Sequence, residues 1–388
     1  MRVAGIIVEY NPLHNGHIEH LNDTRRLTNC DSIVAVMSGN FVQRGEPAIC
    51  DKWRRTRMAL NAGVDVVVEI PVGFVLGGAE AFARGSVGLL AATNVVDALC
   101  FGSESGDLDA MLAAGKILSQ DDKTFREALR AGLNRGLSFA AARGDALSIA
   151  MKNVACATFP PDGLLTRPNN VLGIEYCKAL WDLNLPMEVY TSHRIVRTTA
   201  SGVRKGIFTG QNMASCMPED AYNILMEAAV PGMLGQMDAL SAVFQYILRT
   251  NHTLDVGEGL ENRFRRFALE HWTISDILAA VKTKRYVYTR LQRTVMLMIL
   301  GLSDVTVTAL PYIRILGFRR DAAHLVGEIA KKASIPVLTH GTAMDDLTGY
   351  ARASLEKEFE SSAVYAMSYV GASGAPYTPE RAIPLVVV

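Results

Sequence analysis

The stretch that decides the fold is Val3-Ala-Gly-Ile-Ile-Val8, followed by Glu9-Tyr-Asn-Pro-Leu-His-Asn-Gly-His17. Six apolar or small residues in a row are typical of a parallel strand buried on both faces. The Asn-Pro pair ends that strand, and the apolar spacing of a helix begins at Ile18. The stretch therefore predicts a strand, a tight turn and a helix whose first turn carries His14 and His17.

This arrangement suits the binding of phosphate. A helix N-terminus points free N–H groups and the positive end of its dipole beyond the strand tip. Gly16 lets a ligand approach the backbone, and His14 and His17 can donate hydrogen bonds to phosphate oxygens. On their own, two histidines in a first helical turn would be interpreted as solvent-exposed surface residues. The complete string, however, resembles the His-x-Gly-His signature of the nucleotidyltransferase superfamily, which implies binding of ATP and attack on its α-phosphate.

Composition limits the class of protein. With 49% hydrophobic and 20% charged residues, the chain has the composition of an ordinary globular protein. Its length of 388 residues predicts two domains. Its net charge of zero indicates no global attraction to nucleic acid or membrane. We expect no signal peptide and no membrane span, because no apolar run is long enough. The six scattered cysteines predict reduced thiols in the cytoplasm, rather than disulfides or a zinc site.

Short apolar runs alternate with helical patterns through residues 1–218, which predicts an α/β fold with a Rossmann-like, doubly wound parallel sheet. Ligands of such sheets bind beyond the carboxyl ends of the strands. The histidine turn, the Gly39–Gly45 loop and the Gly102–Gly106 loop should therefore converge on one site. The expected strands are residues 3–8, 31–37, 64–71, 95–101 and 187–190.

A second phosphate-binding element is predicted at Thr198-Thr-Ala-Ser-Gly-Val-Arg-Lys205. Hydroxyls at a helix start, with Arg204 one turn later, form a clamp for phosphate. Arg204 and Lys205 would hold the β and γ phosphates, while the two histidines stabilise the α-phosphate and the departing pyrophosphate. Mg²⁺ is expected to bind together with ATP, but no pair of carboxylates in the sequence indicates a site for it.

Three polar stretches have competing interpretations. Gln43-Arg44-Gly45 is either an ordinary loop or part of the site. The helix after Asp51 carries Lys52, Arg54 and Arg55, which we predict to form a solvated face rather than ligands. Asn169 and Asn170 follow Pro168 and are predicted to cap a helix running to Leu180.

From residue 219 onward helical periodicity dominates, so residues 219–388 are predicted to form a second, mostly helical domain after the catalytic domain 1–218. One short strand is expected at 335–339, and no packing partner is predicted for the apolar tail 383–388. Within residues 219–388, the best candidate surface for tRNA binding combines cations with two tyrosines. Cations can bind phosphates and tyrosines can stack on unpaired bases. The same residues also fit an ordinary charged helix face. The cations are Lys282, Lys284, Arg285, Arg290 and Arg293.

Taken together, these motifs are similar to those of the bacterial tRNA(Met) cytidine acetate ligases. Such a resemblance implies activation of acetate by ATP to acetyl-adenylate, then transfer of the acetyl group to the exocyclic amine of the wobble cytidine of elongator tRNA(Met). The matching segments are Glu9–His17, Gly39–Ala48, Asp51–Trp53, Glu69–Pro71, Phe101–Glu104, Pro168–Tyr176 and Pro311–Phe318, of which Gly39–Ala48 is the most specific.

The resemblance also implies an ATP site. The segment between Arg194 and the clamp is shorter here than in that family, which leaves Arg197 as an alternative to Arg194. The implied ATP-binding residues are Ile7, Val8, Glu9, Tyr10, Asn11, Pro12, His14, Gly16, His17, His20, Gly102, Asn170 and Arg194.

Two other functions are weighed against the ligase. A small-molecule adenylyltransferase would share the ATP site, but would not need the large helical part. A non-catalytic RNA-binding protein would not need His14, Gly16 and His17 together. The expected partners are ATP, acetate and tRNA, without a membrane, and the sequence predicts no particular oligomeric state.

Overall fold

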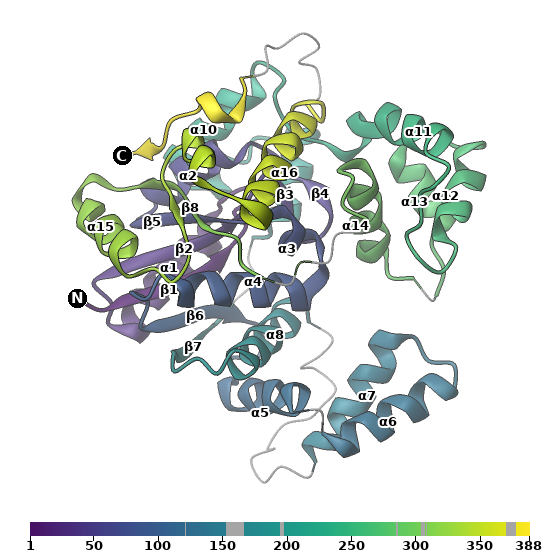
Figure 1. The fold of residues 1–388 in the computed structure, drawn as a ribbon, viewed down its shortest axis with the longest axis horizontal. Helices are drawn as coiled ribbons and strands as arrows, with labels where there is room; N and C mark the ends of the chain where they lie inside the picture. The colour runs from purple at the N-terminus through teal and green to yellow at the C-terminus, as the bar shows by residue number, and fades with distance from the viewer. Residues whose placement is uncertain are drawn as a thin grey trace.

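The computed structural model describes residues 1–120, 122–152, 167–194, 198–284, 286–303, 307, 309–369 and 378–388. Within these residues an eight-stranded sheet forms the centre, in the order β10-β8-β5-β2-β1-β6-β7 with β9 beside β8 (Figure 1). The strands are β1 (Val3–Val8), β2 (Ser32–Ser38), β5 (Val66–Ile70), β6 (Ala98–Ser103), β7 (Glu188–His193), β8 (Ile313–Phe318), β9 (Val337–Leu338) and β10 (Val386–Val387).

The predicted α/β fold and its parallel sheet are confirmed. Strands β5, β2, β1, β6 and β7 run parallel to one another. The chain moves outward from β1 through β2 to β5, then returns to place β6 on the other side of β1. This reversal opens a crevice between the carboxyl ends of β1 and β6, where ligands of doubly wound sheets bind.

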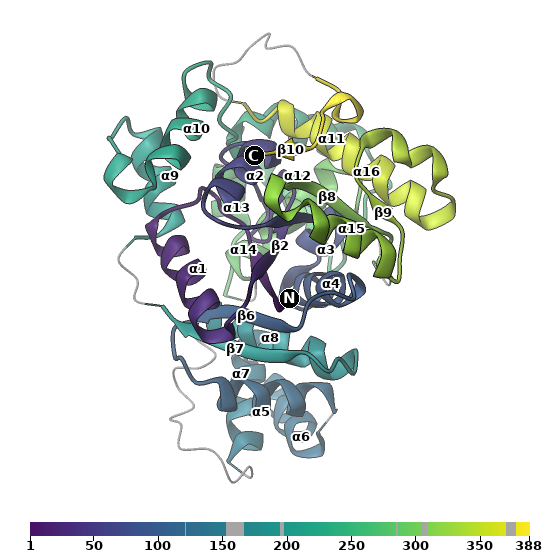
Figure 2. The same ribbon diagram turned by 90° about the vertical axis from the view of Figure 1, so that its left-hand side faces the viewer.

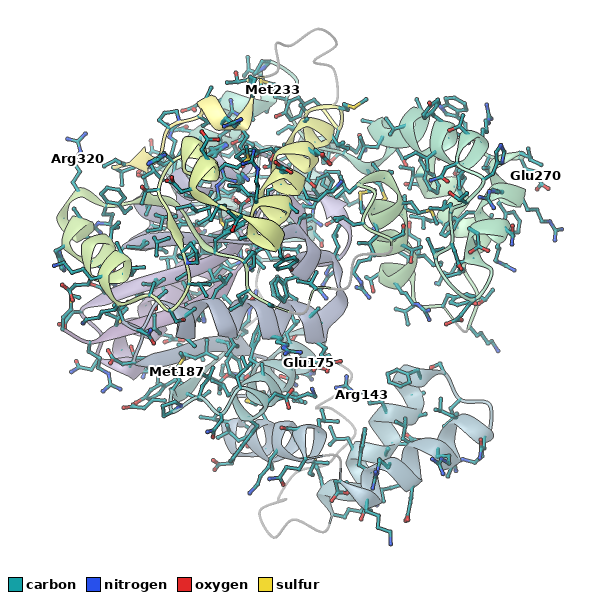
Figure 3. The ribbon with its side chains drawn as sticks, in the orientation of Figure 1. Arg143, Glu175, Met187, Met233, Glu270 and Arg320 are labelled. Carbon is teal, nitrogen blue, oxygen red and sulfur yellow. The ribbon has the colours of Figure 1, made fainter. Side chains whose placement is uncertain are left out.

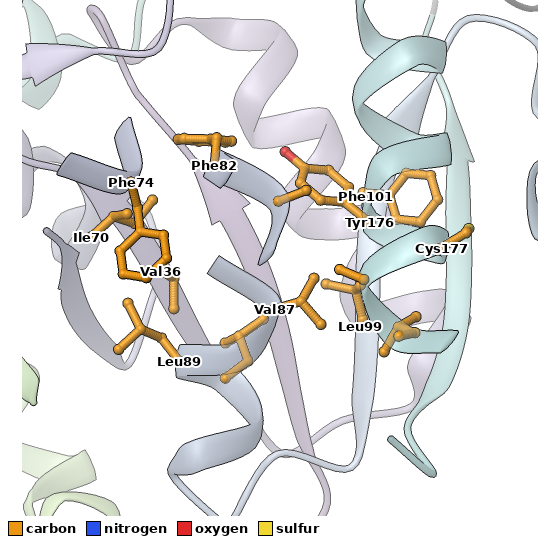
Figure 4. Close-up of a cluster of buried hydrophobic side chains, with 14 of the residues drawn as sticks. Val36, Ile70, Phe74, Phe82, Val87, Leu89, Leu99, Phe101, Tyr176 and Cys177 are labelled. Carbon is orange, nitrogen blue, oxygen red and sulfur yellow. The ribbon is translucent and has the colours of Figure 1, made fainter. Parts of the chain in front are cut away.

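Helices cover both faces of the sheet (Figure 2). One face packs against α4 (Gly78–Ala92), α5 (Leu108–Ser119), α8 (Pro168–Asp182) and α15 (Ala323–Lys332) through one apolar cluster. The other face packs against α1 (Asn15–Thr28), α2 (Lys52–Asn61) and α10 (Glu219–Ala229). The branched and aromatic side chains of the first cluster interdigitate around Phe74, Val87 and Leu99 (Figure 4). Burial of both faces explains why the inner strands β1, β2 and β5 are almost entirely apolar.

A helical hairpin of α6 (Lys123–Asn134) and α7 (Phe139–Met151) projects from the α5–α8 side of the molecule (Figure 1). Arg143 of α7 pairs with the buried carboxylate of Glu175 on α8 at 2.5 Å (Figure 3). This ion pair ties the hairpin to the body of the molecule.

A separate helical group packs against a small hairpin, β3 (Phe41–Val42) and β4 (Glu46–Pro47), and against α3 (Val72–Leu76). Gly45 in the turn has φ +83°, and a Cβ there would lie 2.4 Å from the backbone N of Arg293. The helical group therefore contacts the Gln43-Arg44-Gly45 loop directly. Its helices are α11 (Ser241–Thr250), α12 (Leu260–Ala268), α13 (Ile274–Val281) and α14 (Tyr288–Ile299).

The sheet extends across the division expected at residue 218. Strand β8 pairs antiparallel with β5, and β9 and β10 pair with β8. No strand is predicted at Ile313–Phe318, because Arg314 and Gly317 interrupt its apolar run. The apolar tail, for which no partner is predicted, supplies β10. Residues 219–388 therefore combine the helical group with three strands of the central sheet.

The prediction that Lys52 and Arg55 form a solvated face is wrong, since both are fully buried. Lys52 pairs with Glu69 and, at 2.5 Å, with Glu380, and Arg314 pairs with the same two carboxylates. Carboxylates from distant segments reach these cations, which local sequence does not reveal. The helix α9 (Ala200–Phe208), the helix α16 (Gly349–Ala366) and short 3₁₀ turns at Ala214–Cys216, Met237–Leu240, Arg320–Ala322, Gly341–Asp346 and Glu380–Ala382 complete the described fold.

Candidate active site

A cleft with a volume of about 370 Å³ opens at the carboxyl ends of β1 and β6. It gathers most residues that the sequence singled out, whereas Pro12 and Asn170 do not line it. The predicted residues that line it are Ile7, Val8, Glu9, Tyr10, Asn11, His14, Gly16, His17, His20, Gly102, Arg194 and Arg204.

The two histidines are held by the first turn of α1. His14 is its N-cap: Nδ1 of His14 accepts a hydrogen bond from Gly16 N, and Nδ1 of His17 accepts one from His14 N, both at 3.1 Å. The rings stack with centroids 3.8 Å apart. Because each Nδ1 accepts a backbone hydrogen bond, each neutral ring carries its proton on Nε2. The pair therefore offers two Nε2–H donors at a helix N-terminus.

Burial and nearby positive charge keep the three histidines of this turn neutral. Burial and Arg194 lower the pKa of His14 to about 4, and the same two causes lower the pKa of His20 to about 4. Burial, followed by the neighbouring histidine and arginine, lowers the pKa of His17 well below its usual value. Neutral imidazole donors suit a ligand that brings its own negative charge.

Arg204 reaches the cleft from α9, whose N-cap is Thr199. Its guanidinium donates to the carbonyl of Asn11 at 2.8 Å and pairs with Glu46 at 2.6 Å. Thr199, Ala200 and Ser201 line the cleft next to it. The hydroxyl-bearing helix start with an arginine one turn later thus stands where the sequence predicted a phosphate clamp.

The loop between β3 and β4 belongs to the site, because Gln43, Arg44 and Glu46 line the cleft. Glu9 holds this loop by accepting a hydrogen bond from Gln43 N at 2.6 Å. Arg55 supports the same region from beneath, donating to the carbonyls of Glu9 at 2.6 Å and of Gly39. The buried α2 arginine therefore positions the loop without lining the cleft.

Asn169 and Asn170 do not cap α8, contrary to the prediction. The helix starts at Pro168, and the carboxylate of Glu104 accepts the backbone N–H groups of Asn169 at 3.2 Å and of Asn170 at 2.9 Å. The side chain of Asn170 turns back to accept from Glu104 N and Ser105 N. A carboxylate at the helix start is the stronger partner for the free N–H groups. Asn170 thus shapes the loop after β6 without lining the cleft.

Gly102 and Arg194 are neighbours at the ends of β6 and β7. A Cβ on Gly102 would lie 2.9 Å from Cδ of Arg194, so the arginine side chain occupies the space that glycine leaves. Arg194 also donates its backbone N–H to the carbonyl of Ser103. The alternative, Arg197, lies outside the described residues.

Sequence reasoning missed one side of the cleft. Phe82 from α4 and Leu172 and Tyr176 from α8 line it together with Phe101 from β6. Phe82 lies in an alanine- and glycine-rich helix that carries no chemical signal. Tyr176 belonged to a segment used only for the family resemblance. Their meeting depends on how α4 and α8 cross the sheet.

The predicted tRNA surface is only partly a set of free cations. Lys282 and Lys284 are exposed, but Arg290 pairs with Glu258 at 2.8 Å. Arg293 is half-buried beside the turn at Gly45, and burial followed by nearby Arg290 lowers its pKa. Arg285 lies outside the described residues.

Within the described residues, no group of three His, Cys, Asp or Glu side chains is arranged to hold a metal ion. Of the carboxylates that line the cleft, Glu46 pairs with Arg204, Glu104 binds the start of α8, and Glu9 accepts a hydrogen bond from Gln43 N. Among the described residues, the cleft therefore shows no preformed Mg²⁺ site. No helix in the described part of the chain is long and apolar enough to cross a membrane. The described cysteines are free, and Cys156 lies outside the described residues.

Comparison with known proteins identifies the family of the chain. A family model described as HIGH Nucleotidyl Transferase matches residues 1–375. The tRNA(Met) cytidine acetate ligase of Thermoanaerobacter sp. (strain X514) is 35% identical over 395 residues, covering 96% of this chain and 97% of that protein. The enzyme of the same name from Clostridium novyi (strain NT) is 34% identical over 402 residues, covering 94% and 100%.

Solved structures give the same result. The crystal structure of Thermotoga maritima TmcAL bound with alpha-thio ATP matches with a TM-score of 0.89 and 29% identity over 100% of both chains. The apo form of the same protein matches with a TM-score of 0.90 and 28% identity. The chain therefore belongs to the HIGH nucleotidyl transferase family and, within it, to the family of the tRNA(Met) cytidine acetate ligases.

Proposed function

We propose that this chain is an ATP-dependent ligase that activates acetate and acetylates the exocyclic amine of the wobble cytidine of elongator tRNA(Met). The observation that carries the proposal is the meeting of His14, His17 and Arg204 in one cleft. Support comes from the full-length match to a structure that holds an ATP analogue and from relatives whose name gives the tRNA substrate. The free thiols are compatible with a cytoplasmic enzyme.

In the first step, a carboxylate oxygen of acetate attacks the α-phosphorus of ATP. The bond from that phosphorus to the oxygen bridging to the β-phosphate breaks, and pyrophosphate leaves. The Nε2–H groups of His14 and His17 and the N-terminus of α1 would donate to the α-phosphate, while Arg204 would hold the departing phosphates. Mg²⁺ bound to the ATP phosphates would neutralise part of their charge. Most of the catalysis is then positioning and charge stabilisation.

In this binding mode Arg204 must exchange partners. In the structure its guanidinium is paired with Glu46. A polyphosphate offers more negative charge and bidentate geometry than one carboxylate. Binding of ATP would therefore draw Arg204 from Glu46, a carboxylate on the loop that contacts the helical group.

We assign tRNA contact to the helical part of residues 219–388, through exposed Lys282 and Lys284. A Lys282→Glu, Lys284→Glu variant should raise the KM for tRNA several-fold, because each lost phosphate contact weakens binding. Acetate-dependent exchange between ATP and pyrophosphate should stay unchanged. The matched control is Lys331→Glu, Lys332→Glu on α15, another exposed lysine pair. Equal KM values for tRNA in the two variants would contradict the assignment of tRNA contact to Lys282 and Lys284.

The function itself is tested by incubating the protein with ATP, Mg²⁺, labelled acetate and an unmodified tRNA pool. We expect ATP-dependent label confined to elongator tRNA(Met). His14→Ala should abolish it, whereas His324→Ala, a change at an exposed histidine outside the cleft, should not. If no label enters tRNA and a small acceptor becomes adenylylated instead, the small-molecule adenylyltransferase is the correct function. Absence of any ATP turnover would leave the non-catalytic RNA-binding protein.

A further inference from the structure

The cleft has two chemically different sides because the residues of a strand alternate between the faces of the sheet. Val8 of β1 belongs to the core under α1, while Ile7 packs against the core under α4 and α8. In β6, Cys100 and Phe101 divide in the same way. We name the two sides by their residues. The histidine side holds His14, His17, His20, Arg194 and Arg204, and the aromatic side holds Phe82, Phe101, Leu172 and Tyr176.

Of the four side chains of the aromatic side, only Tyr176 carries a polar group. Phe101 and Tyr176 meet edge to face with centroids 5.5 Å apart, and Figure 4 shows the Tyr176 hydroxyl pointing toward Phe82. The carboxyl of Glu9 lines the same cleft as Tyr176. One oxygen of Glu9 accepts from Gln43 N. Its other oxygen has no hydrogen-bond partner within the described residues.

This chemistry fits a pyrimidine base that carries an amine. Aromatic side chains stack on unpaired bases, and a glutamate carboxylate accepts the exocyclic amine of cytosine. Acetate fits worse, because its own carboxylate would face Glu9 at close range. The ATP phosphates belong on the histidine side, where the donors and arginines are. A base on the aromatic side would then face the α-phosphate across the tips of β1 and β6.

Resting on the proposed function, we propose that the aromatic side is the subsite of the acceptor cytosine and that Glu9 is a catalytic residue which binds its exocyclic amine and takes its proton. The nitrogen lone pair attacks the carbonyl carbon of acetyl-adenylate, and a C–N bond forms. The amine proton passes to the carboxylate of Glu9. The bond between the carbonyl carbon and the phosphate oxygen breaks, AMP leaves with the electron pair, and Glu9 later releases the proton to water.

The surroundings of Glu9 raise its pKa, which favours its use as a base. Burial raises its pKa above the usual value, and Glu46 adds to the rise. The backbone N–H of Gln43 and the cations Arg55 and Arg44 oppose this rise. A raised pKa brings a carboxylate closer to the range in which general bases work.

The decisive variant is Glu9→Gln, which keeps the shape and still accepts from Gln43 N. Acetyl transfer to tRNA should fall by about 10²–10⁴-fold, the usual contribution of a general base. Acetate-dependent exchange between ATP and pyrophosphate should fall far less than transfer, because the first step does not use this proton. The matched control is Glu80→Gln, an exposed glutamate on α4, which should retain both activities.

Two further readouts separate a catalytic role from a structural one. The first uses tRNA(Met) with a wobble uridine as an inhibitor. It should bind the wild-type enzyme poorly, because the uracil carbonyl would face the Glu9 carboxylate. It should bind the Glu9→Gln variant better, because the glutamine amide can donate a hydrogen bond to that carbonyl. In the unmodified enzyme, transfer should be lost as pH falls through the pKa of Glu9 while exchange persists. This second measurement needs no variant.

The failures can be told apart. If Glu9→Gln lowers exchange as much as transfer, or if transfer and exchange fall together as pH decreases, the assignment of Glu9 is overturned while the proposed function stands. If the unmodified protein shows neither exchange nor transfer, the proposed function has failed first. Unchanged transfer in Glu9→Gln likewise overturns the assignment.

Discussion

His17 is where the sequence signature and the geometry meet most directly. It stacks on His14 and stays neutral, so it can act only as a hydrogen-bond donor from Nε2. His17→Ala should reduce acetate-dependent exchange about 10²–10³-fold, as loss of one donor to developing charge does in other enzymes. His324→Ala is the control, because this exposed histidine does not line the cleft. Exchange within a few-fold of the unmodified protein would contradict a catalytic role for His17.

The lowered histidine pKa values also predict how stability depends on pH. The unfolded chain binds a proton to His14 near pH 6.5, whereas the folded chain binds it only near pH 4, owing to burial and Arg194. The unfolded state thus holds more protons between these values, and the contribution of His14 to stability is lost as pH falls from about 6.5 to 4. Urea unfolding at several pH values should show a shallower decline in His14→Gln. An identical decline in both proteins would refute this.

At the scale of elements, the contact between α14 and the β3–β4 turn joins the helical group to the cleft. Gly45 combines φ +83° with backbone of α14 in the place of a side chain. Gly45→Ala should cost more than the strain of about 1–2 kcal/mol expected for a left-handed alanine, because the helix must also move. Gly136→Ala is the matched control, with φ +81° and nothing within 4 Å of the added carbon. Equal losses in thermal unfolding would mean that the contact has no extra effect.

At the scale of the whole molecule, a buried ionic cluster of Lys52, Glu69, Arg314 and Glu380 joins four distant segments of the chain. Glu380→Ala would leave Lys52 and Arg314 with one carboxylate between them. Removing one partner of a buried pair costs about 3–5 kcal/mol, so the melting temperature should fall by many degrees. Glu356→Ala, which breaks the exposed pair with Arg352, should cost at most about 1 kcal/mol. Similar melting temperatures for the two variants would show that the cluster does not hold the tail.

The sequence by itself determined the features that depend on neighbouring residues. The period of the apolar residues predicted the strands β1, β2, β5, β6 and β7 and most helices. For the inner strands the reason is that burial on both faces of a parallel sheet demands continuous apolar runs. The first turn of α1 was predicted with its two histidines, and Thr199 with Arg204 were predicted at the start of α9, since capping and helix dipoles are local effects.

Only the tertiary structure decided which distant residues meet. Lys52 looks like a surface lysine until Glu69 and Glu380 surround it, and Asn170 looks like a cap until Glu104 replaces it. The strand β8 escaped prediction because a buried arginine, paired by partners from other segments, interrupts its pattern. Phe82 and Tyr176 came to the cleft through the packing of α4 and α8 on the sheet. These long-range contacts depend on how whole layers of helices and sheet pack together, so the local spacing of residues along the chain does not predict them.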